Sequence, residues 1–237
     1  IEILVMGAFA AFCLFLLRRE GLLRDGMSVS FAAAALLLAF ALRYFALPYE
    51  TLDYQNFLTR WVDHFRRSGG FSALRDPVGN YNVPYLYFLA AFSYTDYSDL
   101  YLIKYLSIAF DVLLAWAVMK LCSLVNGKRL ARLWAFLGTL LLPTVVLNGS
   151  LWGQCDSIYV ALALTAIYCA LSGRPRLSLL FMALSFSFKL QAVFFMPVFF
   201  VLFVSGRIRW RDIWIVPGTY LLSVLPAVLL GRPLLST

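Results

Sequence analysis

The stretch SVSFAAAALLLAFALRYFALP, residues 28–48, decides the fold class of this chain. Arg43 is the only charged residue in it, and about 20 apolar residues in a helix are enough to cross the hydrocarbon core of a bilayer. Similar apolar stretches recur along the rest of the chain, whereas strands of a membrane β-barrel would alternate in polarity over about ten positions. The sequence therefore predicts an all-α protein that crosses a membrane several times.

The composition of the whole chain agrees with this prediction. Of its 237 residues, 62% are hydrophobic and 14% are charged, whereas soluble domains are about 45–50% apolar and about 25% charged. These values exclude a soluble globular fold, and the abundance of aromatic residues excludes a disordered chain. We attribute the net charge of +8 to basic cytoplasmic loops, which orient membrane helices, and expect no nucleic acid partner.

Histidine and cysteine are scarce. His64 is the single histidine, and the four cysteines form no C-x-x-C pair. The sequence therefore predicts neither a disulfide framework nor a metal site. Chemistry has to come from carboxylates and from Lys, Arg, Asn, Gln and Tyr side chains.

Clusters of basic residues predict the topology, because such clusters face the cytoplasm. They are Arg18-Arg19-Arg24, Lys128-Arg129-Arg132, Arg174-Arg176 and Arg207-Arg209-Arg211. With these inside, segment 28–48 ends outside and segment 100–124 returns, so residues 49–99 form one outer loop. The expected apolar segments are 1–17, 28–48, 100–124, 133–149, 157–171, 177–188, 192–204 and 213–230. We take residues 1–18 as an extra N-terminal transmembrane helix, residues 28–231 as one membrane module, and the chain as continuing beyond Thr237.

The outer loop is expected to contain surface helices. Apolar residues recur with helical spacing between positions 54 and 65, and polar residues occupy the opposite face. This pattern is typical of a helix that lies in the membrane interface, or equally of one packed on the protein's own outer surface. A second apolar piece, Pro84–Tyr94, is too short to span and should lie on or dip into the outer face.

Several later helices are also short. Arg176 and Lys189 are 13 residues apart, a rise of about 20 Å, whereas the hydrocarbon core is about 30 Å thick. Non-helical backbone at such a depth is tolerated only inside protein or beside a watery cavity. We therefore expect a cavity that opens outward and is roofed by residues 49–99.

Charged residues near the expected cavity suggest its ligand. Arg43, Lys104, Asp156 and Lys189 fall at one depth when counted from the cytoplasmic ends of their helices. Three cations there suit an anionic head such as a lipid phosphate. For Arg43 and Lys104 the alternative is snorkelling to the outer headgroups, whereas Lys189 lies in a short turn that favours a phosphate contact. Asp111 is deeper, and a buried hydrogen bond between helices or a protonated acid is favoured over catalysis.

Two further segments carry polar groups at this level. Residues 148–159 offer amides, an indole and a carboxylate, which suits sugar binding; a capped loop with Asp156 as helix N-cap is the alternative. Asp53, just before the first surface helix, is either a general base at the cavity mouth or again an N-cap.

These motifs together resemble one family over residues 29–231. They are Asp53-Tyr54, Gly69-Gly70, Asn80-Tyr81-Asn82-Val83-Pro84-Tyr85-Leu86-Tyr87, Lys104 with Asp111, Leu151-Trp152-Gly153-Gln154-Cys155-Asp156, and Phe188-Lys189-Leu190-Gln191. The chain is similar to GT-C glycosyltransferases, in particular to bacterial proteins like the GPI mannosyltransferase of the PIG-V type, and more weakly to dolichyl-phosphate-glucose glucosyltransferases. Val83 departs from the pattern, because relatives usually have two prolines here.

The resemblance implies a module of seven transmembrane helices and an inverting transfer of a sugar, with mannose favoured, from a polyprenyl-phosphate donor. The acceptor, a glycolipid, glycan or protein hydroxyl, would lie on the exoplasmic face, with Asp53 as general base. Lys189, with Arg43 and Lys104 as helpers, would bind the donor phosphate without metal or cofactor. Candidate substrate-binding residues are Tyr54, Asn80, Tyr81, Trp152, Gln154, Asp156 and Gln191. The alternative is a transporter of a lipid-linked substrate or a non-catalytic lipid-binding scaffold.

Overall fold

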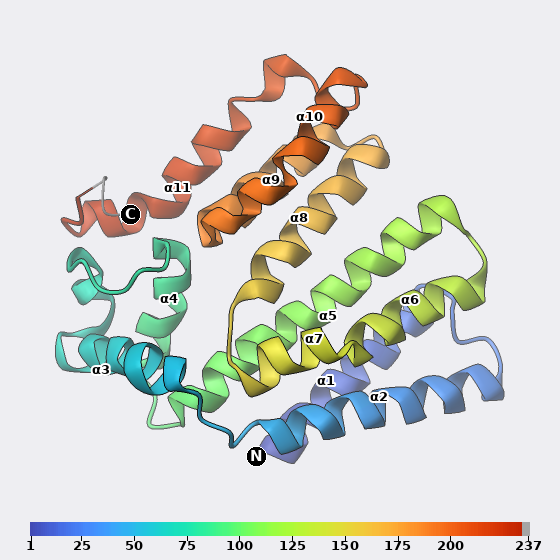
Figure 1. Ribbon diagram of the computed structural model, residues 1–237, viewed down its shortest axis with the longest axis horizontal. Coiled ribbons are helices and arrows are strands. Elements are labelled where there is room, and N and C mark those ends of the chain that lie inside the picture. The colour runs from blue at the N-terminus through green and yellow to red at the C-terminus, as the bar shows by residue number, and fades with distance from the viewer. Residues whose placement is uncertain (234–237) are drawn as a thin grey trace.

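The computed structural model describes residues 1–233 and contains only helices and their connections in this range (Figure 1). The predicted all-α class is therefore confirmed, and each apolar segment named above is mostly helical. The α-helices are α1 (Glu2–Arg19), α2 (Gly26–Ala46), α3 (Thr59–Arg67), α4 (Val83–Phe92), α5 (Asp99–Val125), α6 (Arg129–Leu141), α7 (Pro143–Val146), α8 (Asp156–Leu171), α9 (Pro175–Phe188), α10 (Met196–Val204) and α11 (Ile215–Leu229). The expected continuation beyond Thr237 lies outside the described residues.

Short turns of tighter or wider helix connect several of these elements. Tyr54–Leu58 and Leu147–Leu151 are π-helical, and Gly70–Arg75, Leu190–Phe195 and Trp210–Asp212 are 3-10 helical. π-helical turns are rare and occur often at functional sites. Of the two π-helical turns in the described chain, one directly follows Asp53 and the other comes shortly before Gln154.

Three helices among residues 1–233 are long and apolar enough to cross a membrane. They are α2, α5 and the stretch Trp210–Leu229. A fourth span is possible if α6 and Pro143–Leu151, which meet at an angle of 45°, count as one bent helix. The remaining apolar helices α4, α8, α9 and Leu190–Val204 are shorter, as the sequence predicted.

The extra N-terminal helix is present as α1, packed along α2. It is not among the spans, since its 18 residues include Glu2, Arg18 and Arg19. Helix α2 begins with a capping box after the loop that joins it to α1. In this capping box, Ser28 N–H donates to the Asp25 carboxylate at 2.8 Å.

Helix α5 is central to the arrangement. It packs against α6 on one side and α8 on the other, and α9 and α11 follow α8 outward (Figure 1). One apolar cluster joins α5 with α1, α2 and α6 through residues such as Leu36, Ile108 and Phe136. A second joins α5 and α8 to the segment 58–90. Helix α5 thus links the N-terminal helices to the segment predicted as the outer loop.

The segment 49–99 packs on the protein itself. In the helix that begins at Tyr54, the side chains of Leu58, Val62 and Phe65 are buried within the second apolar cluster. Of the two alternatives for this amphipathic pattern, the structure therefore supports packing on the protein's own surface. Helix α4 is likewise buried along most of its length, so it lies within the fold and does not rest loosely on its surface.

Candidate functional site

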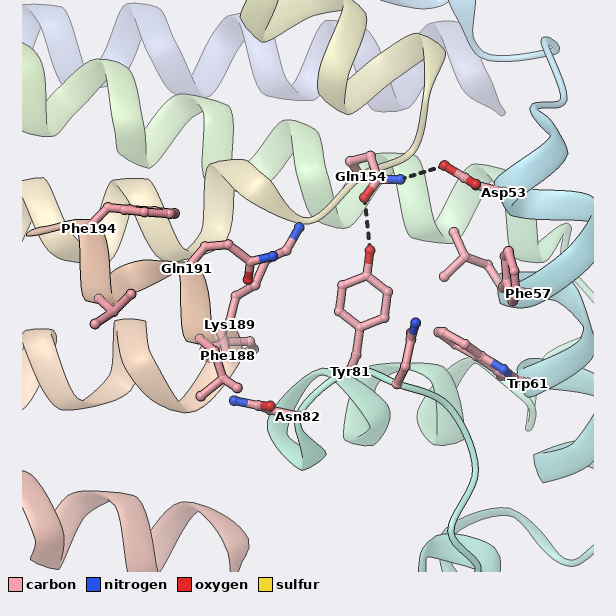
Figure 2. Close-up of a pocket in the computed structure, with 14 residues that line it drawn as sticks. Asp53, Phe57, Trp61, Tyr81, Asn82, Gln154, Phe188, Lys189, Gln191 and Phe194 are labelled. Atoms are coloured by element: carbon pink, nitrogen blue, oxygen red, sulfur yellow. Dashed lines mark hydrogen bonds between the residues drawn. The ribbon is translucent and has the colours of Figure 1, made fainter. Parts of the chain in front are cut away.

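A pocket of about 530 Å³ lies between the segment 49–99 and the ends of the short helices (Figure 2). One wall comes from the turn into α3 and from residues 80–82, and the other from Gln154 and residues 188–194. The predicted cavity under this segment is therefore present. Its lining residues are Asp53, Phe57, Leu58, Trp61, Asn80, Tyr81, Asn82, Gln154, Phe188, Lys189, Leu190, Gln191, Val193 and Phe194.

Asp53 presents its carboxylate to this pocket and is held by two donors. Trp152 Nε1–H donates to Asp53 Oδ2 at 2.7 Å, and Gln154 Nε2–H donates to the same oxygen at 3.0 Å. Within residues 1–233, Oδ1 accepts no hydrogen bond, so it is open to a ligand. Asp53 stands at the N-terminal end of the turn Tyr54–Leu58 but makes no side-chain capping bond to it, so a capping role for its carboxylate is not supported.

Gln154 and Tyr81 connect Asp53 to the middle of the pocket. Tyr81 O–H donates to Gln154 Oε1 at 2.8 Å, which orients the Gln154 amide so that its NH₂ group faces Asp53 (Figure 2). Burial, with smaller effects of Cys155 and Asp156, raises the pKa of Tyr81 well above its ordinary value. The phenol is thus a neutral donor at physiological pH.

Lys189 lies beyond Tyr81, at the other side of the pocket. Its ammonium forms an ion pair with Asp156 and lies 5.4 Å from the centre of the Tyr81 ring. Asn148 Nδ2–H donates to the second oxygen of Asp156 at 3.0 Å. Asp156 is the first residue of α8 and not its N-cap, so that alternative is not supported. An ammonium has three donors, and the ion pair leaves Lys189 with N–H groups for a ligand.

Arg43 does not lie at the pocket. Its side chain is fully buried between α2, α5 and α6, where Nη2–H donates to Asp111 Oδ2 at 2.9 Å and Nη1–H donates to Leu140 O at 2.8 Å. The helix turns the Arg43 side chain inward, toward α5 and α6, and away from the pocket. Asp111 also accepts a hydrogen bond from Ser157, in agreement with the predicted buried bond between helices.

Lys104 is also buried and does not line the pocket. Its Nζ donates to Ala46 O, Leu47 O and Tyr49 O at 3.0, 2.9 and 2.6 Å. These three carbonyls satisfy all its donors. A direct contact of Arg43 or Lys104 with a phosphate in this pocket is therefore not supported, and neither snorkels to the surface.

Of the remaining predicted substrate-binding residues, two line the pocket and two do not. Asn80 and Gln191 line the pocket and are exposed. Trp152 contacts it through Asp53, whereas Tyr54 packs with the second apolar cluster. Among the residues not predicted, Phe57 and Trp61 form an aromatic surface, with ring centres 6.1 Å apart. Their spacing of four and eight residues from Asp53 would have placed them on its face of the helix.

No group of three or more His, Cys, Asp or Glu side chains suited to a metal ion occurs in the described part of the chain. Comparison of the chain with protein-family models, with curated proteins and with solved structures finds no match.

Proposed function

We propose that this protein is a membrane glycosyltransferase of the GT-C type, which transfers a sugar, with mannose favoured, from a polyprenyl-phosphate donor to an acceptor hydroxyl. The observation that carries the proposal is the pairing in one pocket of a carboxylate with an open oxygen, Asp53, and an ammonium with open donors, Lys189. A sugar-phosphate substrate needs a base at its acceptor side and a cation at its phosphate side.

Asp53 suits the role of the base because its orientation is fixed. Two donors hold Oδ2, and Oδ1 of this pocket-lining residue accepts no hydrogen bond from the described residues. The aromatic surface of Phe57 and Trp61 lies on the same side, where it offers a face for a sugar ring. An acceptor hydroxyl that donates to Oδ1 would be deprotonated as it attacks.

Lys189 suits the role of the phosphate contact. Its side chain is 13% exposed and lies in the pocket wall, so its charge is little screened by solvent. Asp156 keeps it in place while the pocket is empty, and the phosphate of the donor would share it with Asp156. Gln191, on the same turn, adds a polar group to this side.

The apolar rim offers a route for the lipid chain of the donor. Leu190, Val193 and Phe194 line the pocket, and all three are exposed, Phe194 by 77%. Helix α10 continues this surface with further exposed apolar side chains such as Phe200 and Val201. In a bilayer such a surface faces lipid tails.

The membrane arrangement follows from the same proposal. Helices α2, α5, the bent pair α6 and 143–151, α8, α9, the stretch 190–204 and α11 would form the seven-helix module, with the pocket on the exoplasmic side. The short helices would end below the lipid surface, around the pocket. The basic clusters at the opposite helix ends favour this orientation.

The proposed reaction needs only the two substrates and the side chains of Asp53 and Lys189. The acceptor oxygen attacks the anomeric carbon and forms the new glycosidic bond, while its proton passes to Asp53 Oδ1. The bond between the anomeric carbon and the phosphate oxygen breaks, and the electron pair leaves with polyprenyl phosphate, whose charge Lys189 stabilises. Attack opposite the leaving group inverts the anomeric configuration.

A transfer assay tests the proposal. The purified protein in liposomes is given polyprenyl-phosphate mannose or glucose with labelled sugar, and glycolipids extracted from membranes of the source organism serve as acceptors. We expect label in the acceptor fraction, release of polyprenyl phosphate and an inverted linkage. Saturable donor binding without release of polyprenyl phosphate from any donor would overturn the proposal and favour a non-catalytic lipid-binding protein.

A further inference from the structure

One face of α5 carries buried polar residues that bind different parts of the chain. Lys104, Ser107 and Asp111 follow one another at intervals of three and four residues, so they share a face of the helix. All three are at most 1% exposed. Polar groups buried in this way cost free energy unless they are bonded, and each of the three makes specific hydrogen bonds across the fold.

Lys104 holds the end of α2. Its ammonium donates to the carbonyls of Ala46, Leu47 and Tyr49, where the helix ends and the chain turns toward the pocket. The carbonyls at a helix C-terminus attract a cation and are otherwise unsatisfied. Asp53 follows the last of these residues by four positions. Lys104 therefore sets the point from which the Asp53 segment starts.

Ser107, one turn further along α5, holds the opposite segment. Its Oγ–H donates to the backbone oxygen of Gln154 at 2.8 Å. The adjoining Gly153 has a φ of +72°, and a Cβ there would lie 3.8–3.9 Å from the Lys104 side chain. The segment of Gln154 thus runs close over Lys104, and a bond from Thr51 Oγ1–H to Trp152 O at 3.3 Å joins the two segments directly.

The side chains of these two segments meet at the Asp53 carboxylate. Trp152 and Gln154 donate to Asp53 Oδ2 from one segment, and Asp53 lies on the other. We propose that Lys104 and Ser107 are positioning residues for Asp53, because they fasten both segments to adjacent turns of one rigid helix. The role in catalysis rests on the proposed function of Asp53 above, whereas the role in geometry does not.

The first test is kinetic. A displacement of about 1 Å at a reacting group can lower the rate about 10²-fold, so we expect Lys104→Met to lower kcat by about that factor with an unchanged KM for the donor. Ser107→Ala, a milder change, should lower kcat several-fold in the same way.

Lys120→Met is the matched control, since Lys120 lies on the same helix but pairs with Glu20 far from the pocket. It should leave kcat unchanged. A raised donor KM for Lys104→Met with unchanged kcat would instead make Lys104 a phosphate contact and overturn the proposal.

The second test needs no activity. The Trp152 indole N–H donates to Asp53, so its NMR resonance reports on that hydrogen bond. The resonance is assigned with Trp152→Phe, and Asp53→Asn gives the reference for an altered bond. We expect Lys104→Met and Ser107→Ala to move the Trp152 resonance toward that reference, while the indoles of Trp134, Trp210 and Trp214 and the Lys120→Met spectrum stay unchanged. An unmoved Trp152 resonance in folded Lys104→Met and Ser107→Ala would overturn the proposal, whether or not the protein transfers sugar. If Lys104→Met does not fold, Ser107→Ala alone decides between these two outcomes.

Discussion

Two pairs of opposite charge lie in different surroundings within this fold, one on each side of the N-terminus of α8. Arg43 and Asp111 are both 0% exposed, and Asp111 also bonds Ser157. Lys189 lines the pocket and pairs with Asp156, and 13% and 36% of their side chains are exposed. Two neighbouring residues of α8 thus contact the two pairs, because Asp156 belongs to one and Ser157 donates a hydrogen bond to Asp111 of the other.

The difference shows which cation is open to a ligand. The Arg43 guanidinium donates to a carboxylate and two backbone carbonyls in a closed space, and its two carbonyl partners are Ala39 O and Leu140 O. The ammonium of Lys189 borders the pocket and retains unused donors. A buried pair joins helices, whereas a pair at a pocket wall can exchange its anion for that of a substrate.

The largest effect is expected at the buried pair. Asp111→Ala leaves the Arg43 charge buried without its anion, and breaking such a pair costs about 3–5 kcal/mol of stability. Thermal unfolding in detergent, or the fraction of monodisperse protein after mild heating, measures the loss. Stability within about 1 kcal/mol of wild type would contradict the description of this pair as buried and closed to solvent.

A double substitution separates the loss of the pair from the cost of an orphan charge. Replacing both partners, Arg43→Met with Asp111→Leu, removes the charge together with its anion, and such replacements are often neutral or stabilising. We expect the double variant to be more stable than Asp111→Ala alone. The same unfolding measurement shows it, and a double variant less stable than the single one would count against this reasoning.

The pocket pair should respond in ligand binding more than in stability. Lys189→Met removes a charge-assisted contact worth about 1.5–3 kcal/mol, so the affinity for a short-chain isoprenyl phosphate should fall at least about tenfold. Titration calorimetry measures it. Lys120→Met provides a lysine control of the same size away from the pocket, and equal affinities in the two variants would remove Lys189 from the phosphate site.

A smaller effect of opposite sign is expected for the partner of Lys189. Asp156→Asn keeps the shape of the side chain but removes the anion that competes for the ammonium. The affinity for isoprenyl phosphate, which lacks the sugar, should therefore rise a few-fold. A fall in this affinity would mean that Asp156 orients Lys189 for the phosphate and does not compete with it.

The smallest effect is expected at an exposed pair. Arg176 and Asp212 lie 3.3 Å apart, and 74% of the Arg176 side chain but 11% of the Asp212 side chain is exposed, so solvent screens the cation of this pair. Exposed pairs contribute about 0–1 kcal/mol. Arg176→Ala should therefore leave the unfolding midpoint nearly unchanged. A loss of stability as large as that of Asp111→Ala would show that the contribution of these pairs to stability does not depend on their burial.

The helices could be predicted from the sequence because each apolar run is bounded by charges or turn formers. The pocket between residues 49–99 and the turn of Lys189 could also be predicted. The helix 176–188 is too short to cross the hydrocarbon core, which predicts a cavity between its end and residues 49–99. Which apolar helices are long enough to span depends on the length of the uncharged stretch between their ends, and in α1 this stretch is shortened by Glu2, Arg18 and Arg19.

The partners of the buried cations could not be predicted. Counting residues gives the positions of Arg43 and Lys104 along their helices but not the directions of their side chains, which depend on how the helices pack. Arg43 finds Asp111 68 positions away, and Lys104 finds backbone carbonyls, which have no signature in the sequence. Gln154, in contrast, was predicted at the site, and only its fixed amide orientation between Asp53 and Tyr81 required the structure.

The central claim is that Asp53 acts as the general base, and one comparison tests it most directly. Transfer from polyprenyl-phosphate mannose is measured for wild type, for Asp53→Asn and for Asp63→Asn, an exposed carboxylate on the following helix. We predict that Asp53→Asn binds isoprenyl phosphate normally but loses about 10²–10⁴-fold in kcat, whereas Asp63→Asn keeps its activity. Normal transfer by a folded Asp53→Asn protein would contradict the claim.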